Sequence, residues 1–178
     1  MGAGVALSAC QGAPSSAPPP ADTQGPGSSP TVYFQQLKAF LPSSVEGFTQ
    51  VRERGSTGKY GEVSVSEAER VFQESGGEAP REISVRIVDT TIAQRLGRSI
   101  RAAVEDGAHK AHTDPFAPIQ LRDALGFVRY DPEEEQAEAN LLVGNRYVVA
   151  VTTHGFVSTV EAREIARGLD LTGLAQLR

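Results

Sequence analysis

The stretch QAEANLLVGNRYVVAVTTH, residues 136–154, constrains the fold more than any other part of this sequence. Apolar and polar residues alternate in two runs, as they do in strands with one buried face. Between the runs lies Gly144-Asn145, a pair typical of the two-residue turn of a β-hairpin. The residues predicted to share one face of this hairpin are Leu141, Val143, Tyr147, Val149 and Val151. We therefore expect the late strands of the chain to be antiparallel.

The same alternation predicts strands earlier in the chain. The clearest is REISVRIVD, residues 81–89, in which branched apolar residues alternate with Ser84 and Arg86. The stretch 62–72 begins with alternation that then slips in phase, which a β-bulge or two shorter elements would explain. The glycine-rich stretch GSTGKYG, residues 55–61, predicts a turn. Shorter strands are expected at 47–54, 119–123 and 126–130.

Three helices are predicted from apolar residues at helical spacing. The first lies within residues 31–41, and the second ends at Asp106-Gly107. The third begins at Ser158 and Glu161, which have the spacing of a capping box. The expected inner faces are Ile92, Leu96, Ile100 and Val104 in the second helix, and Val160, Ile165 and Leu169 in the third.

The predicted order over residues 31–178 is helix, strands, helix, strands, helix. This order indicates a single α+β domain, in which a mainly antiparallel sheet packs with about three helices as an α/β sandwich. The strand–helix–strand unit in the middle is the one place where a parallel arrangement is expected. The element order over residues 31–178 resembles the PsbP/Mog1-like group, small α/β domains that recur in bacterial lipoproteins. The resemblance rests on no motif and implies no functional residues.

The first 30 residues have a different composition. Residues 11–30 contain six prolines, three glycines, four serines and one charge, so they have little apolar surface to bury and predict a disordered tether. Before them, LSAC at residues 7–10 resembles the lipobox of bacterial lipoproteins, which implies that Cys10 is acylated. Residues 1–10 are then a truncated lipoprotein signal ending in the lipidation cysteine. The alternative is a cysteine without function in a disordered tail.

The same resemblance implies a location. In lipoproteins of bacteria with two membranes, an Asp after the acylated cysteine indicates retention in the inner membrane, and here the residue is Gln11. We therefore expect a lipid-anchored outer-membrane protein whose domain faces the periplasm or the cell surface. No apolar run approaches the ~18 residues of a spanning helix. The net charge of −5 and the lack of a basic patch argue against nucleic acid as a partner.

Few residues are grouped in a way that suggests catalysis. HKAH places His109 and His112 three residues apart with Asp114 close behind, a set that can bind zinc on a helix. Gly107 and Pro115 flank this stretch and instead predict a loop with two solvated histidines. The carboxylates of DPEEE predict a solvated hairpin tip, and no cofactor is expected.

Three functions compete at this stage. The first is a non-catalytic interaction or assembly module, which would bind an envelope protein and carry an exposed apolar or mixed patch on the sheet. The second is a lipoprotein that binds a small ligand or lipid, which requires a cavity of ligand size. The third is a metal-dependent enzyme that uses His109 and His112. Because no catalytic motif is present, we expect the first function and no enzyme activity.

Overall fold

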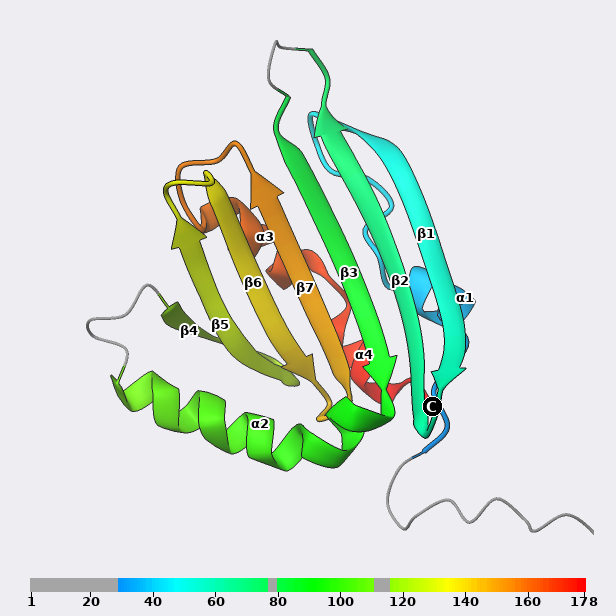
Figure 1. The fold of residues 1–178 in the computed structure, drawn as a ribbon. Helices are drawn as coiled ribbons and strands as arrows, with labels where there is room; N and C mark the ends of the chain where they lie inside the picture. Colours follow the sequence, from blue (N-terminus) through cyan, green and yellow to red (C-terminus); the bar gives the residue numbers. More distant parts are fainter. Residues whose placement is uncertain (1–28, 77–79, 111–115) are drawn as a thin grey trace, which may run out of the picture.

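The computed structural model describes residues 29–76, 80–110 and 116–178. These residues form a seven-stranded antiparallel sheet with four helices, which confirms the predicted α+β fold (Figure 1). In chain order the elements are α1 (Phe34–Lys38), β1 (Phe48–Tyr60), β2 (Val63–Glu74), β3 (Glu82–Thr90), α2 (Thr91–Lys110), β4 (Phe116–Leu121), β5 (Ala124–Asp131), β6 (Gln136–Val143), β7 (Tyr147–His154), α3 (Val160–Gly168) and α4 (Leu171–Gln176).

The strands lie in the order β1-β2-β3-β7-β6-β5-β4, and all neighbours are antiparallel. The chain builds one half of the sheet from β1 to β3, crosses to the far edge through α2, and returns from β4 to β7. Because four antiparallel steps separate β3 from β4, these two strands run in the same direction. The expected parallel arrangement is thus correct in direction, but the two strands are not neighbours.

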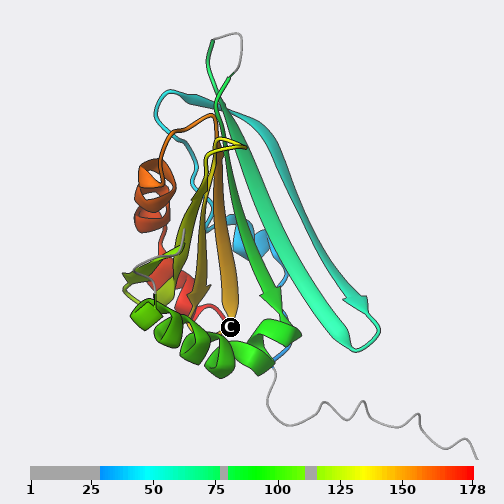
Figure 2. The same cartoon turned by 60° about the vertical axis from the view of Figure 1, so that its left-hand side comes forward.

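The two faces of the sheet are covered differently. Helices α1, α3 and α4 pack on one face, here called the core face, and enclose most of the buried apolar side chains (Figure 2). The largest buried side chains of this core are Leu37, Phe72, Ile83, Ile87, Leu141, Tyr147 and Leu174. Helix α2 lies across one end of the opposite face (Figure 1). The rest of that face, here called the open face, has no helix over it among the described residues.

The hairpin of β6 and β7 confirms the prediction from the alternating pattern. Leu141 lies opposite Val149, and Val143 lies opposite Tyr147, as expected for residues that share a face. Gly144 and Asn145 both have positive φ angles, of 57° and 59°. The loop nevertheless has three residues rather than two, because Arg146 stands between this turn and the paired Tyr147.

The glycine-rich turn predicted at residues 55–61 is wrong. These residues continue strand β1 to Tyr60, and the turn consists of Gly61 and Glu62. Gly61 has a φ of +62°, which suits the turn. Gly55 is needed for a different reason, because a neighbouring ring leaves no space for a side chain. The ring of Phe34 lies over Gly55, and a Cβ atom there would be 2.4 Å from Phe34 Cδ2. This glycine makes room for a side chain of α1.

The predicted β-bulge is present, but it lies on the neighbouring strand. Strand β2 is continuous, whereas the register of β1 shifts between Gln50 and Arg52, so that Val51 is the extra residue. The apolar phase of β2 slips because Val71 and Phe72 are both buried, on opposite faces of the sheet.

Two helix predictions also need correction. Helix α2 continues through Asp106-Gly107 to Lys110, so the loop predicted after residue 107 begins later. Helix α3 has Thr159 rather than Ser158 as its N-cap, although the Ser158 hydroxyl still donates to a Glu161 carboxylate oxygen 3.4 Å away. Val160 points to solvent and is 56% exposed, and the buried residues of this helix are Ala162 and Ala166.

The contact between Phe34 and Gly55 gives a first prediction. Gly55→Ala should lower the free energy of unfolding by about 1–3 kcal/mol, because the ring must move to admit a methyl group. Urea unfolding followed by circular dichroism measures this change. Adding Phe34→Ala should remove much of the difference between glycine and alanine at residue 55.

Gly58→Ala is the matched control on the same strand. The atoms nearest to its Cβ would belong to the Tyr60 side chain, at 3.5 Å or more, which is an ordinary van der Waals distance. We expect little change in stability. Equal losses for the alanine variants of Gly55 and Gly58 would contradict the proposed role of Phe34.

Candidate functional site

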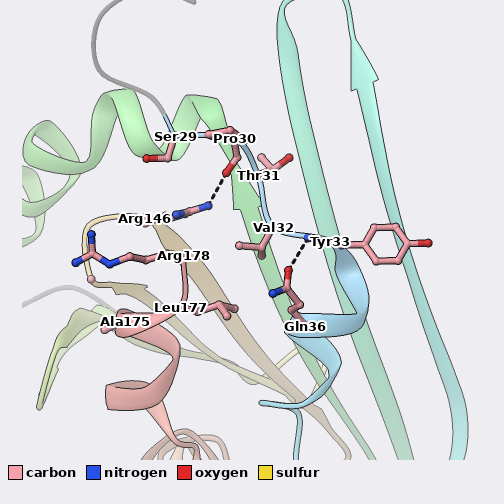
Figure 3. Close-up of a pocket in the computed structure, with 11 residues that line it drawn as sticks. Ser29, Pro30, Thr31, Val32, Tyr33, Gln36, Arg146, Ala175, Leu177 and Arg178 are labelled. Carbon is pink, nitrogen blue, oxygen red and sulfur yellow. Dashed lines mark hydrogen bonds between the residues drawn. The ribbon is translucent and has the colours of Figure 1, made fainter.

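A cavity of about 600 Å³ lies where the two ends of the described chain meet (Figure 3). One wall is the segment before α1, and another is the end of the chain after α4. The charged side chains among its described lining residues are Arg146 and Arg178. Arg146 donates from Nη2 to the carbonyl oxygen of Pro30 at 2.8 Å. None of the described side chains in the lining is a carboxylate, histidine or thiol.

Beside the cavity, Asp89 and Arg146 form a buried ion pair. Asp89 lies near the end of β3 and is fully buried. Arg146 Nη2 is 2.8 Å from Asp89 Oδ2, and Arg146 Nε is 3.2 Å from Asp89 Oδ1. The pairing is therefore bidentate, the geometry that guanidinium and carboxylate groups favour.

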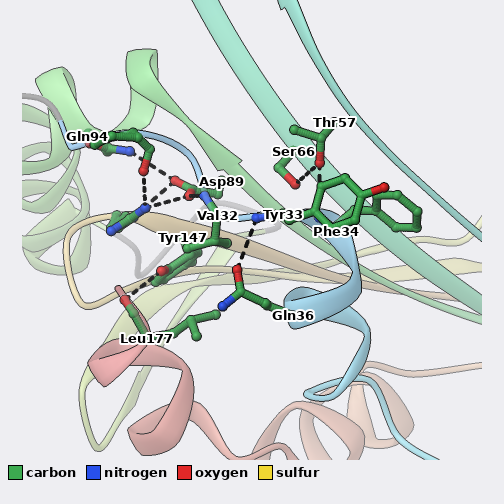
Figure 4. A network of polar contacts seen from close by, with 12 residues as sticks. Val32, Tyr33, Phe34, Gln36, Thr57, Ser66, Asp89, Gln94, Tyr147 and Leu177 are labelled. Atoms are coloured by element: carbon green, nitrogen blue, oxygen red, sulfur yellow. Dashed lines mark hydrogen bonds and ion pairs between the residues drawn. The ribbon is translucent and has the colours of Figure 1, made fainter.

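The same carboxylate accepts two further hydrogen bonds (Figure 4). The main-chain N–H of Val32 donates to Oδ2 at 2.8 Å, and Gln94 Nε2 donates to Oδ1 at 3.0 Å. These contacts join the segment before α1, strand β3, helix α2 and the loop before β7. With four donors around it, Asp89 is a structural acceptor and lacks the access to substrate that a general base needs.

Two neighbouring groups stay protonated at neutral pH. Burial lowers the pKa of Arg146, but the hydrogen bonds and the charge of Asp89 outweigh it, so the net shift is upward. Burial raises the pKa of Tyr147 to about 12. The Tyr147 hydroxyl donates to the carbonyl oxygen of Leu177 at 2.7 Å and so holds the end of the chain against the sheet. This cluster therefore has a structural role.

The open face presents a mixed polar surface. Its central residues are Glu67, Glu69, Ser84, Arg86, Arg129, Glu138, Ala150 and Thr152. Acidic and basic side chains from neighbouring strands pair across it, such as Arg86 with Glu67 and Arg129 with Glu138. Between these pairs lie the small side chains of Ser84, Ala150 and Thr152. The surface therefore mixes charged and small side chains, carries nearly equal numbers of acidic and basic groups, and is partly exposed.

Glu138 is an acid of the open face that accepts hydrogen bonds from several side chains. Its carboxylate receives Arg129 Nε at 2.9 Å and Arg129 Nη2 at 3.0 Å. The hydrogen bond from Arg129 lowers the pKa of Glu138, and Gln136 and Asn140 add to the effect. On the outer strands, Arg54 Nε is 2.5 Å from Glu69 Oε2, and Ser84 donates to Glu69 Oε1 at 3.3 Å.

An apolar hollow lies between α2 and the end of the sheet face that this helix covers. Its volume is about 360 Å³, within the range of small-molecule sites. The described residues around it are Val104, Leu125, Gly126, Phe127, Asn140, Leu141, Leu142 and Val148. Asn140 provides the polar side chain in this lining.

The structure does not test the predicted site residues. Cys10, His112 and Asp114 lie outside the described residues, and His109 lies in the last turn of α2 with a side chain that is not described. Elsewhere in the described ranges, no three His, Cys, Asp or Glu side chains gather as a metal site would require. At the hairpin tip, Asp131 accepts from the N–H of Glu133 at 3.0 Å, and the residues that follow it are exposed, as predicted.

The sequence analysis did not find the cluster of Asp89 and Arg146. A possible signal was the acidic residue near the end of an otherwise apolar strand face, because a buried carboxylate needs a cationic partner. Nothing local to Arg146 identified it as that partner, since 57 positions separate the two residues.

Comparison with family models, curated proteins and solved structures finds no match for this chain. Among the described helices, none combines the length and hydropathy needed to cross a bilayer. The site must therefore be interpreted from its own geometry.

The buried ion pair gives a second prediction. Asp89→Asn should lower the free energy of unfolding by about 3–5 kcal/mol, because it leaves the Arg146 guanidinium buried without a counter-charge. Thermal and urea unfolding at neutral pH measure the loss. Glu67→Gln, which removes the charge from a partly exposed pair with Arg86, is the matched control and should cost less than about 1 kcal/mol. Similar losses for both variants would contradict the central role of Asp89.

The lowered pKa of Glu138 gives a third prediction. A carboxylate whose pKa is lower in the folded protein stabilises the fold above its unfolded pKa, and this stabilisation is lost as the pH falls through the folded value. The wild type should therefore exceed Glu138→Gln in stability most clearly above the ordinary glutamate pKa of 4.5. The gap should close on acidification. A gap that is constant from pH 7 to pH 3 would contradict this assignment.

Proposed function

We propose that the protein is a lipid-anchored interaction module of the bacterial cell envelope, attached through Cys10. The domain would bind an envelope protein through the open face, without catalysis. The observation that carries the proposal is the open face itself, a broad mixed surface that α2 leaves uncovered and that is partly exposed. Such a surface suits a non-obligate partner, because those interfaces are about as polar as the rest of a protein surface.

The paired charges support selective binding. Arg86 and Glu67 lie on adjacent strands, and both are partly exposed, as are Arg129 and Glu138. Exposed ion pairs of this kind contribute little to the free energy of unfolding. Their alternation of sign favours a partner with the complementary pattern and disfavours others, which is how interface electrostatics gives specificity. Ser84, Ala150 and Thr152 leave room between them for side chains of the partner.

The apolar hollow under α2 favours a second candidate function. A volume of about 360 Å³ with a mainly apolar lining fits a short acyl chain or a small apolar molecule. In that function the protein would bind a lipid or other small ligand, and α2 would cover it. An enzyme that depends on metal at His109 and His112 is the least supported candidate, since neither His112 nor the side chain of His109 belongs to the described part of the structure.

The fourth prediction concerns the native mass of the membrane-extracted protein. The full chain should be expressed behind a complete lipoprotein signal sequence, extracted in mild detergent and measured by native mass spectrometry. We expect loss of the residues before Cys10, addition of acyl chains and a non-covalently bound protein. Thr152→Arg, which places a long cation in the centre of the open face, should remove the bound protein but keep the acyl chains.

Val157→Arg is the matched control, because Val157 is 85% exposed and lies in the loop after β7, away from the open face. It should keep both the acyl chains and the bound protein. A bound mass of a few hundred daltons in place of a protein would favour the ligand-binding candidate. An unmodified Cys10 would refute the lipid anchor, and a bound protein that survives Thr152→Arg would refute the open face as its site.

A further inference from the structure

Strand β1 forms an unusually long edge of the sheet. It has 13 residues, pairs with β2 on one side and, within the described part of the chain, has no strand on the other. Among the described residues, no main-chain group from outside the sheet bonds to the main chain of residues 49–60, although the N–H of Phe34 donates to the Thr57 hydroxyl at 2.9 Å. Val51 and Tyr60 are 51% and 71% exposed. An open edge of this length is a template for pairing with another strand.

The geometry of β1 determines which part of the edge can pair. Tyr60 pairs with Val63 across a two-residue turn, so its main-chain N–H and C=O groups face β2. Because these groups alternate in direction, the odd-numbered residues from Glu53 to Lys59 direct theirs away from the sheet. The bulge at Val51 ends this regular edge at the other side. The pairing segment is therefore Arg52–Tyr60, with Ser56 at its centre.

We propose that β1 pairs with β1 of a second copy of this chain, antiparallel and centred on Ser56. In this register Lys59 on the core-face side lies opposite Glu53 of the second copy. On the open-face side, Arg52 lies opposite the ring of Tyr60 of the second copy, a pairing that suits a cation–π contact. All nine residues from Arg52 to Tyr60 find a partner, and the two sheets become one.

Other registers lack this match. Centring the pair on Glu53 would place Arg52 opposite Arg54 of the second copy, and centring it on Lys59 would place two lysines opposite each other. Like charges directly opposite destabilise strand pairs. An edge lysine normally discourages such pairing. In the register centred on Ser56 the charge of Lys59 instead meets the Glu53 carboxylate, which Lys38 and Arg70 of its own chain also contact. No like charges lie directly opposite each other in this register.

The fifth prediction uses a disulfide to test this register. In the proposed pair, the two Ser56 residues lie opposite each other at a non-hydrogen-bonded position, where Cα atoms are about 4.5 Å apart. That separation is within the range of disulfides. We expect the full chain carrying Cys10→Ser and Ser56→Cys to form a covalent dimer under mild oxidation. The matched control is Gln50→Cys in the same background, an exposed position whose two copies would lie roughly 40 Å apart at ~3.3 Å per residue.

The expected result is at least tenfold more covalent dimer for Ser56→Cys than for Gln50→Cys. Analytical ultracentrifugation of Cys10→Ser alone should show a dimer, and Lys59→Pro should shift it to monomer with an unchanged circular dichroism spectrum. Proline removes an outward N–H that β2 does not use, a substitution that edge strands tolerate. Equal cross-linking at both positions, a monomeric protein, or a dimer in which Ser56→Cys stays unlinked would each overturn the proposal.

Discussion

The buried pair of Asp89 and Arg146 is the interaction on which the rest of the structure depends. Arg146 belongs to the loop that connects β6 to β7, and Asp89 lies near the end of β3, the strand that joins the two halves of the sheet. Through this pair, Val32 and Gln94 are held at the same end of the fold. A charge this deeply buried is tolerated only with its partner in place, so the pair favours one arrangement of these four segments over looser ones.

The two faces of the sheet differ in what stabilises them. The core face is closed by three short helices, whose stability comes from apolar packing because helices of this length are marginal alone. The open face is stabilised little by its exposed ion pairs. Its side chains can therefore vary at small cost to the fold. The division explains how a domain of this size can keep a firm core and still offer a wide surface.

The sequence predicted the elements whose signals are local. The hairpin around Gly144-Asn145, strand β3 and the α+β class all follow from alternation and turn residues. The prediction of a turn at residues 55–61 was wrong because Gly55 makes room for Phe34. The two residues are 21 positions apart, so no local pattern indicates their contact. The pair of Asp89 and Arg146 was missed for the same reason, and so was Arg146 as the third loop residue. The open face was predicted only as a patch, since its residues come from five strands.

The attachment of the N-terminal segment has a mechanical consequence. A pull on the chain before residue 29 reaches the fold first at Pro30 and Val32, which are bound to Arg146 and Asp89. The load therefore passes directly into β3 and β7, the central strands, where it is shared among ladders on both sides. An edge strand would instead peel away one hydrogen bond at a time. Tension applied at this point would therefore reach the centre of the sheet before either of its edges.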